Sequence, residues 1–171
     1  MVRRALCEPT APPRRQLATA AVHQDSQEST VIEITRKGSV MLVTLPHIHD
    51  PRGDLTFVEG RGHVPFDIAR VYYLYNVPVD AERGGHAHKK LEQVVFALSG
   101  SFRLKVDDGH EKAEYWLRDP RRGLYISRLV WREMDSFSQG AVCMVLASHR
   151  YDESDYHRNY EDFIREVRVS Q

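Results

Sequence analysis

The chain has 171 residues, which is enough for one domain with a substantial core but too few for two ordinary domains. Lys plus Arg and Asp plus Glu balance at 24 each, so no net charge attracts nucleic acid or an anionic membrane. No run approaches the roughly 18 apolar residues of a membrane span, and Cys7 and Cys143 indicate neither a disulfide framework nor a zinc knuckle, which is typical of the cytoplasm.

The first 30 residues contain Arg, Ala, Pro and Ser but lack the apolar segment of a secretory signal. An Arg-rich, acid-poor start can imitate an organelle transit peptide, but the composition favours a disordered tail over residues 1–30. We therefore expect one folded domain over residues 31–171.

Short runs of β-forming residues separated by turn residues follow the tail. The residues Asp107, Asp108 and Gly109 form a strong hairpin signal between two alternating runs. About nine strands with no helices between them favour an antiparallel sandwich or barrel. The expected strands cover residues 31–35, 40–45, 55–59, 69–77, 94–98, 101–106, 113–117, 124–131 and 141–147.

The end of the chain has a different pattern. Residues 152–167 are polar and charged, with apolar and aromatic side chains at helical spacing from Tyr156 onward. Ser154 or Asp152 could cap this helix. We expect one helix packed on the outside of the β-structure.

Two histidines, His86 and His88, stand two residues apart ahead of the apolar run over 94–98. In a strand, side chains two residues apart leave by the same face, so both imidazoles are expected to point into whatever that face encloses. Converging imidazoles are typical of a metal site or of proton-transfer chemistry. The alternative is a pair of structural histidines, and a pair on one strand face favours function over it.

The spacing of His86, His88, Gln93 and Gly100 resembles the first signature of the cupin superfamily, a small jelly-roll barrel. In metal-binding cupins the position of Gln93 is a glutamate ligand, and an amide oxygen is a poorer ligand. The best counterpart of the second signature places Arg132 where a histidine ligand is usual, and arginine cannot ligate a metal. We therefore expect no metal and no other cofactor, with the imidazoles free to move protons.

A narrower resemblance runs from about residue 31 to residue 168. The chain resembles the sugar 3,4-ketoisomerases, cupins that act on dTDP-4-keto-6-deoxyglucose in deoxysugar biosynthesis. The resemblance implies an all-β, cupin-type antiparallel jelly-roll barrel with a C-terminal helix, and a homodimer. The segments that carry it are DPRGDLTFVEG (50–60), VPFDIARVYYLYNVP (64–78), RGGHAHKKLEQVVFALSGS (83–101), VWREM (130–134) and VLASHRYDESDYHRNY (145–160).

The implied reaction moves a ketone between neighbouring sugar carbons through an enediolate. It needs a neutral base, a second proton-handling group and a stabiliser of the oxyanion. On this interpretation His86 is the base, and His88 orients or relays. Tyr72 donates to a sugar oxygen, although a core aromatic is the alternative for it, and Arg132 either holds the enediolate oxygens or shapes the ring pocket.

A neutral protein must meet the charge of a diphosphate with local cations. Arg52, Arg83 and Lys90 lie in the matching segments, and guanidinium groups suit phosphate oxygens. Together with Gln93 and Arg132 they form the expected substrate-binding set. The residue after the tryptophan, here Arg132, differs between family members that make different carbon-4 epimers, and Arg132 together with Arg52 leaves the product's configuration open.

Three other functions fit the same sequence to a lesser degree. A nucleotide-sugar 3,5-epimerase shares the substrate class and the fold, and a non-catalytic sugar-binding cupin shares the pocket. A metal-dependent oxygenase is disfavoured by Gln93 and Arg132.

Overall fold

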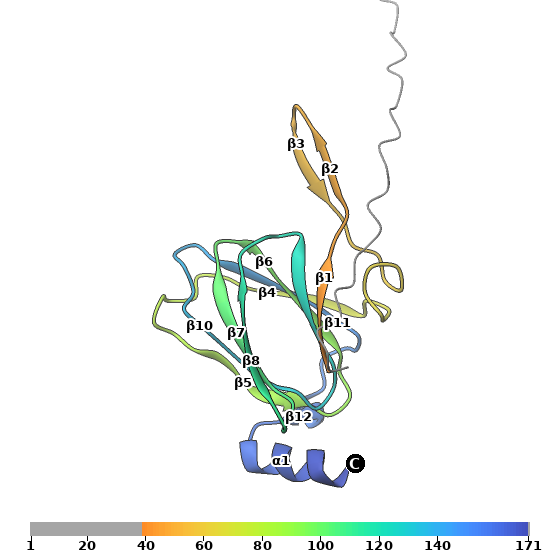
Figure 1. Cartoon of the computed structure of the whole chain (residues 1–171), viewed down its shortest axis with the longest axis vertical. Coiled ribbons are helices and arrows are strands. Elements are labelled where there is room, and N and C mark those ends of the chain that lie inside the picture. The colour runs from red at the N-terminus through yellow and green to blue at the C-terminus, as the bar shows by residue number, and fades with distance from the viewer. Residues whose placement is uncertain (1–38, 171) are drawn as a thin grey trace, which may run out of the picture.

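The computed structural model describes residues 39–170; the expected tail over 1–30 and the expected strand over 31–35 lie outside these residues. Two five-stranded antiparallel sheets face each other, and a helix covers one end (Figure 1). The elements are β1 (Val40–Thr44), β2 (His47–Asp50), β3 (Gly53–Thr56), β4 (Arg70–Leu74), β5 (Arg83–His88), β6 (Gln93–Ser99), β7 (Phe102–Asp107), β8 (Lys112–Leu117), β9 (Arg122–Ile126), β10 (Trp131–Asp135), β11 (Val142–Ala147), the short 3₁₀ helix η1 (Glu153–Asp155), β12 (Tyr156–His157) and α1 (Tyr160–Val169).

The order of strands in the first sheet is β1-β9-β6-β11-β4, and in the second it is β12-β5-β10-β7-β8. Most neighbours in the sheets are far apart in sequence, while β7 and β8 form the expected hairpin over Asp107–Gly109, where the Asp107 carboxylate accepts from the Gly109 amide. This arrangement confirms the expected all-β antiparallel barrel with a C-terminal helix.

Alternation along β7 builds the core between the sheets. Phe102 and Leu104 are fully buried, whereas Arg103 and Lys105 reach outward to ion pairs with Asp135. Strand β6 has no such alternation, because both of its faces are covered. Its inner residues join the central core, while Val94 and Phe96 pack with a second cluster that includes Val64 and Phe66 from the loop before β4.

The run over 124–131, expected as one strand, is divided between β9 and β10. Leu129 adopts a positive φ of 54° between them, which turns the chain from one sheet to the other. A continuous apolar pattern conceals such a break because both strands are buried. The strand expected over 69–77 is likewise shorter and ends at Leu74.

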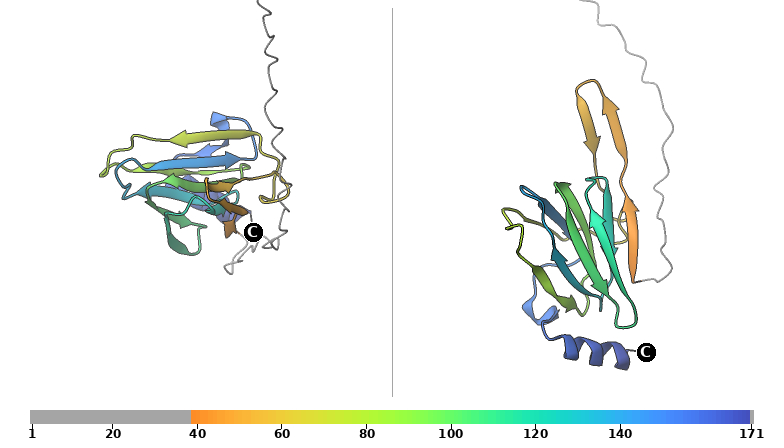
Figure 2. Two further views of the ribbon diagram at one scale, coloured as in Figure 1. Left: turned by 90° about the horizontal axis from the view of Figure 1, so that it is seen from above. Right: turned by 60° about the vertical axis from the view of Figure 1, so that its left-hand side comes forward.

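The strand expected over 55–59 is β3, which ends at Thr56 and pairs with the unpredicted strand β2. This two-stranded hairpin is a separate sheet that projects from the end of the barrel opposite α1 (Figure 2). Ile48 and Leu55 lie opposite each other on it, and each is 54% exposed.

The helix predicted over 152–167 is wrong in its first half, because α1 begins only at Tyr160. Asp152 caps only η1, and Asn159 caps α1 by accepting from the Glu161 and Asp162 amides. Between the two helices, β12 pairs with β5. The side chains with helical spacing therefore belong to different elements. Phe163 and Val167 lie on α1 and pack against Ala87 and Trp131. Tyr156 lies on β12 instead. In the part of the chain that the structure describes, no helix has the length and apolarity needed to cross a membrane.

Candidate active site

A cavity of about 710 Å³ opens between β4, β5, β10 and the segment that contains η1 and β12. Three arginines and two glutamates contribute to its lining, so cations outnumber anions there, as an anionic ligand needs in a chain with no net charge. The lining includes Arg70, Tyr72, Arg83, His86, Tyr156 and Arg158.

The two histidines of β5 lie together at this cavity, as the spacing predicts. The ring centroids of His86 and His88 are 4.9 Å apart in an edge-on arrangement. Tyr156 of β12 lies opposite His88 in the strand register, and its ring centroid is 4.9 Å from that of His86 and 4.3 Å from that of His88. The two imidazoles and the phenol therefore form one cluster, of which His86 and Tyr156 line the cavity.

His88 lies behind His86 and is held by a carboxylate. Its side chain is 1% exposed, and its Nδ1 is 3.0 Å from Asp155 Oδ2. The Lys90 and Leu91 amides donate to the same carboxylate and fix its position. Because a carboxylate accepts the Nδ1 proton, the His88 Nε2 carries the lone pair, and this buried atom has no hydrogen-bond partner among the described residues.

Arg132 of β10 lies opposite His86 in the strand register and is 2% exposed. None of its three guanidinium nitrogens has a hydrogen-bond partner among residues 39–170. Burial lowers the pKa of Arg132 to about 10, and the nearby Tyr72, Tyr156 and Asp155 raise it in part. The guanidinium therefore stays charged at neutral pH, with its donors free for an anionic oxygen.

The two imidazoles are uncharged at neutral pH. Burial, followed by the charge of Arg132, lowers the pKa of His86 from 6.5 to about 4 and that of His88 to about 2. Burial also raises the pKa of the Tyr72 phenol, which accepts from Gln93 Nε2 at 2.9 Å and keeps its own proton to donate. The site thus combines a neutral base, a phenolic donor and a fixed cation.

The structure places the predicted site residues in three groups. His86, Tyr72 and Arg83 line the cavity, and His88, Gln93 and Arg132 are buried beside it. Arg52 and Lys90 do not line it. Arg52 lies at the exposed turn of the β2–β3 hairpin, paired with Asp50 at 2.6 Å, and Lys90 is an exposed residue whose amide bonds to Asp155.

Sequence reasoning missed four residues at the site: Arg70, Asp155, Tyr156 and Arg158. Arg70 lies over the Tyr72 ring at 5.2 Å, and Arg158 lies over the Tyr156 ring at 4.5 Å. The concentration of aromatic, acidic and arginine residues in segment 145–160 was the available signal. The helix prediction concealed it, because it assigned Tyr156 to a helix face packed on the outside.

Comparison with known proteins gives consistent results. The family described as "FdtA: WxcM-like, C-terminal" matches residues 38–168. The TDP-4-oxo-6-deoxy-alpha-D-glucose-3,4-oxoisomerase of Aneurinibacillus thermoaerophilus is 47% identical over 122 residues, which are 71% of this chain and 88% of that protein.

The solved structures agree with this match. The sugar 3,4-ketoisomerase QdtA of Thermoanaerobacterium thermosaccharolyticum, in complex with TDP, is 47% identical and superimposes with a TM-score of 0.76 over 78% of this chain and 97% of that one. A histidine-to-asparagine variant of QdtA, in complex with TDP-4-keto-6-deoxyglucose, matches at 46% identity with the same TM-score and coverage. An epimerase of Mycobacterium tuberculosis, at 20% identity and a TM-score of 0.64, shares the fold only.

Proposed function

The chain belongs to the sugar 3,4-ketoisomerase family, and we propose that its cavity converts TDP-4-keto-6-deoxyglucose to the 3-keto isomer by proton transfer at His86. The observation that carries this mechanism is the neutral imidazole of His86 in the cavity wall, opposite a buried guanidinium whose donors have no partner within residues 39–170. A base and an oxyanion stabiliser thus lie side by side, which is what an enediolate intermediate requires.

In the proposed reaction His86 takes the proton from carbon 3, which the carbonyl at carbon 4 acidifies. The electron pair forms the enediolate, whose oxygens meet the Arg132 guanidinium and the Tyr72 phenol. A proton returns to carbon 4, and the hydroxyl proton of the carbon-3 oxygen passes to the carbon-4 oxygen. The product is the 3-ketone with a 4-hydroxyl group, so no redox partner is needed. His88 is oriented by Asp155, whose Oδ2 lies 3.0 Å from its Nδ1. It either orients the catalytic groups or relays the proton.

We also propose that the reaction needs no metal. Gln93 offers only a neutral amide oxygen, which is a poorer metal ligand than a carboxylate, and Arg132 is a cation that cannot ligate a metal. Among the described residues, the cavity contains no group of three His, Cys, Asp or Glu side chains close enough to share an ion. Turnover that continues in excess chelator would support this proposal, and turnover that stops and returns with added metal would contradict it.

Nuclear magnetic resonance in deuterated water tests the reaction. Incubation with TDP-4-keto-6-deoxyglucose is expected to place deuterium on carbon 4 of a 3-keto product, which a 3-aminotransferase can trap. Exchange at carbons 3 and 5 with a retained 4-ketone would instead indicate a 3,5-epimerase. Binding of TDP without any exchange would indicate a sugar-binding protein. The spectrum of the trapped product also gives the configuration at carbon 4.

We expect the pKa of His86 to rise when TDP binds. Burial, followed by the charge of Arg132, holds this pKa at about 4, and a diphosphate brings a charge opposite to that of Arg132. One negative charge about 10 Å away, at an effective dielectric constant of about 20, is worth about 1.7 kcal/mol, or a little over one pH unit. Titration of the isotope-labelled imidazole by nuclear magnetic resonance measures the shift. Thymidine, which has no diphosphate, is the control, and an equal shift with thymidine would contradict the electrostatic explanation.

We propose that the chain is a homodimer joined through the β2–β3 hairpin. The hairpin pairs with no other sheet of the described chain and exposes Ile48 and Leu55 on one face. An isolated two-stranded hairpin is marginally stable in water, and a second copy would cover these side chains.

Sedimentation velocity tests the dimer. The wild type is expected to sediment as a dimer and the Ile48→Asp/Leu55→Asp variant as a folded monomer. Val79→Asp, at another aliphatic residue that is 61% exposed, is the matched control and should stay dimeric. A dimeric hairpin variant would place the interface elsewhere. A cytoplasmic location also remains a prediction, which cell fractionation tests.

A further inference from the structure

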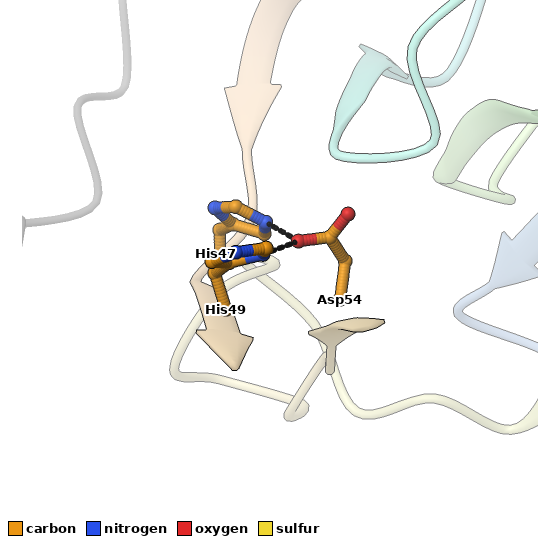
Figure 3. A group of neighbouring side chains, drawn as sticks. All are labelled: His47, His49 and Asp54. Carbon is orange, nitrogen blue, oxygen red and sulfur yellow. Dashed lines mark hydrogen bonds and ion pairs between the residues drawn. The ribbon is translucent and has the colours of Figure 1, made fainter. Parts of the chain in front are cut away.

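Three potential metal ligands lie together on the β2–β3 hairpin (Figure 3). None of them lines the catalytic cavity. They are His47, His49 and Asp54. His47 Nε2 is 2.8 Å and His49 Nδ1 is 2.7 Å from the same Asp54 Oδ1. Among residues 39–170 this is the one group of three such side chains whose ligand atoms all lie within 4.8 Å of one another.

The strand pairing explains why these side chains converge. His47 and His49 are two residues apart on β2, so they leave by the same face. The register places Asp54 of β3 directly opposite His49, and therefore on that face as well. Ile48 and Leu55 face each other on the other side. The hairpin thus has one apolar face and one face of metal-ligating groups.

The geometry is close to that of a bound transition metal. A tetrahedral Zn²⁺ with ligands at about 2.1 Å keeps neighbouring ligand atoms about 3.4 Å apart. The two nitrogen–oxygen distances here are 2.8 and 2.7 Å, so each must open by roughly 0.6 Å. Small side-chain rotations accomplish this, because His49 and Asp54 are 70% and 64% exposed. The ion would then take the place of the protons that now lie between the two imidazole nitrogens and Asp54 Oδ1.

We propose that the face of His47, His49 and Asp54 binds one Zn²⁺ ion and cross-links β2 to β3. Two imidazoles and one carboxylate suit zinc, whereas Mg²⁺ and Ca²⁺ prefer shells of oxygen ligands. The fourth position faces solvent and is open to water or another ligand. Because the hairpin has only two strands, a metal cross-link would stabilise the element that carries Arg52. This inference does not depend on the proposed reaction.

Titration calorimetry with ZnCl₂ on the chelator-treated full chain tests the site. We expect saturable binding of one ion per chain, and a weakening of at least 10- to 100-fold in His49→Gln and in His47→Gln. Co²⁺ is a second probe, because four-coordinate Co²⁺ absorbs visible light far more strongly than the hydrated ion. The variants change exposed side chains, so unchanged circular dichroism should show that they fold.

Two controls separate this site from other imidazoles. His149→Gln removes an exposed histidine outside the hairpin and should bind zinc like the wild type. His86→Asn changes an imidazole of the catalytic cavity and should also bind zinc like the wild type, because the hairpin ligands do not line that cavity. Equal zinc affinity in the wild type and in His47→Gln/His49→Gln would overturn the proposal, as would the absence of saturable binding or a loss of zinc binding in His86→Asn.

Discussion

Replacement of His86 by asparagine is expected to lower kcat by about 10²- to 10⁴-fold, the usual contribution of a positioned general base. Asparagine keeps a polar side chain in the cavity wall but cannot accept the carbon-3 proton. The affinity for TDP should change little, because the arginines that line the cavity remain. Steady-state kinetics with TDP-4-keto-6-deoxyglucose and calorimetry with TDP measure the two quantities separately.

Two further variants make this result specific. His149→Asn changes an exposed histidine outside the cavity and should leave kcat unchanged. His88→Asn removes the imidazole that Asp155 orients, and a smaller loss is expected if it acts through His86. A His86→Asn enzyme with nearly full turnover, beside an inactive His88→Asn enzyme, would assign the base to His88.

Replacement of Arg132 by methionine is expected to separate activity from stability. The loss of a preorganised oxyanion donor should cost about 10²- to 10³-fold in kcat. The free energy of unfolding should stay unchanged or rise by up to about 4 kcal/mol, because the guanidinium is buried and makes no hydrogen bond within residues 39–170. Urea denaturation and steady-state kinetics on the same preparation check both expectations.

Arg103→Met is the matched control. Arg103 forms two bonds of 2.8 and 2.9 Å to Asp135 on the outside of the barrel, so its loss should lower stability modestly and leave kcat intact. A large loss of stability in Arg132→Met would mean that the guanidinium stabilises the folded barrel and would argue against a role in binding the enediolate intermediate. The expected signatures of the two arginine variants are therefore opposite.

Local patterns predict most of the barrel. The alternation of Phe102 and Leu104 with charged residues and the Asp107–Gly109 turn both translate directly into β7 and β8, because each depends only on neighbouring residues. The pairing of His86 with His88 follows from strand geometry in the same way. These features need no knowledge of distant segments.

The errors arise where distant contacts decide the structure. Tyr156 has the spacing of a helix residue, but the backbone of β5 is available to pair with it, and Asn159 is a better cap for the helix that follows. Arg52 and Lys90 lie in the matching segments, but neither lines the cavity of its own chain: Arg52 pairs with Asp50 at the turn of the β2–β3 hairpin, and Lys90 is exposed. No pattern within one segment indicates that β2 and β3 leave the barrel.

The short strand β12 has a consequence for biosynthesis. Asp155 and Tyr156, which orient and cover the imidazoles, follow every other strand of the described barrel in sequence. During translation the ribosome therefore releases the long strands first. The proton-transfer centre is completed only when Asp155 and Tyr156 emerge. A nascent chain that stops before residue 155 would contain both histidines and most of the barrel, but neither the partner carboxylate nor the covering ring.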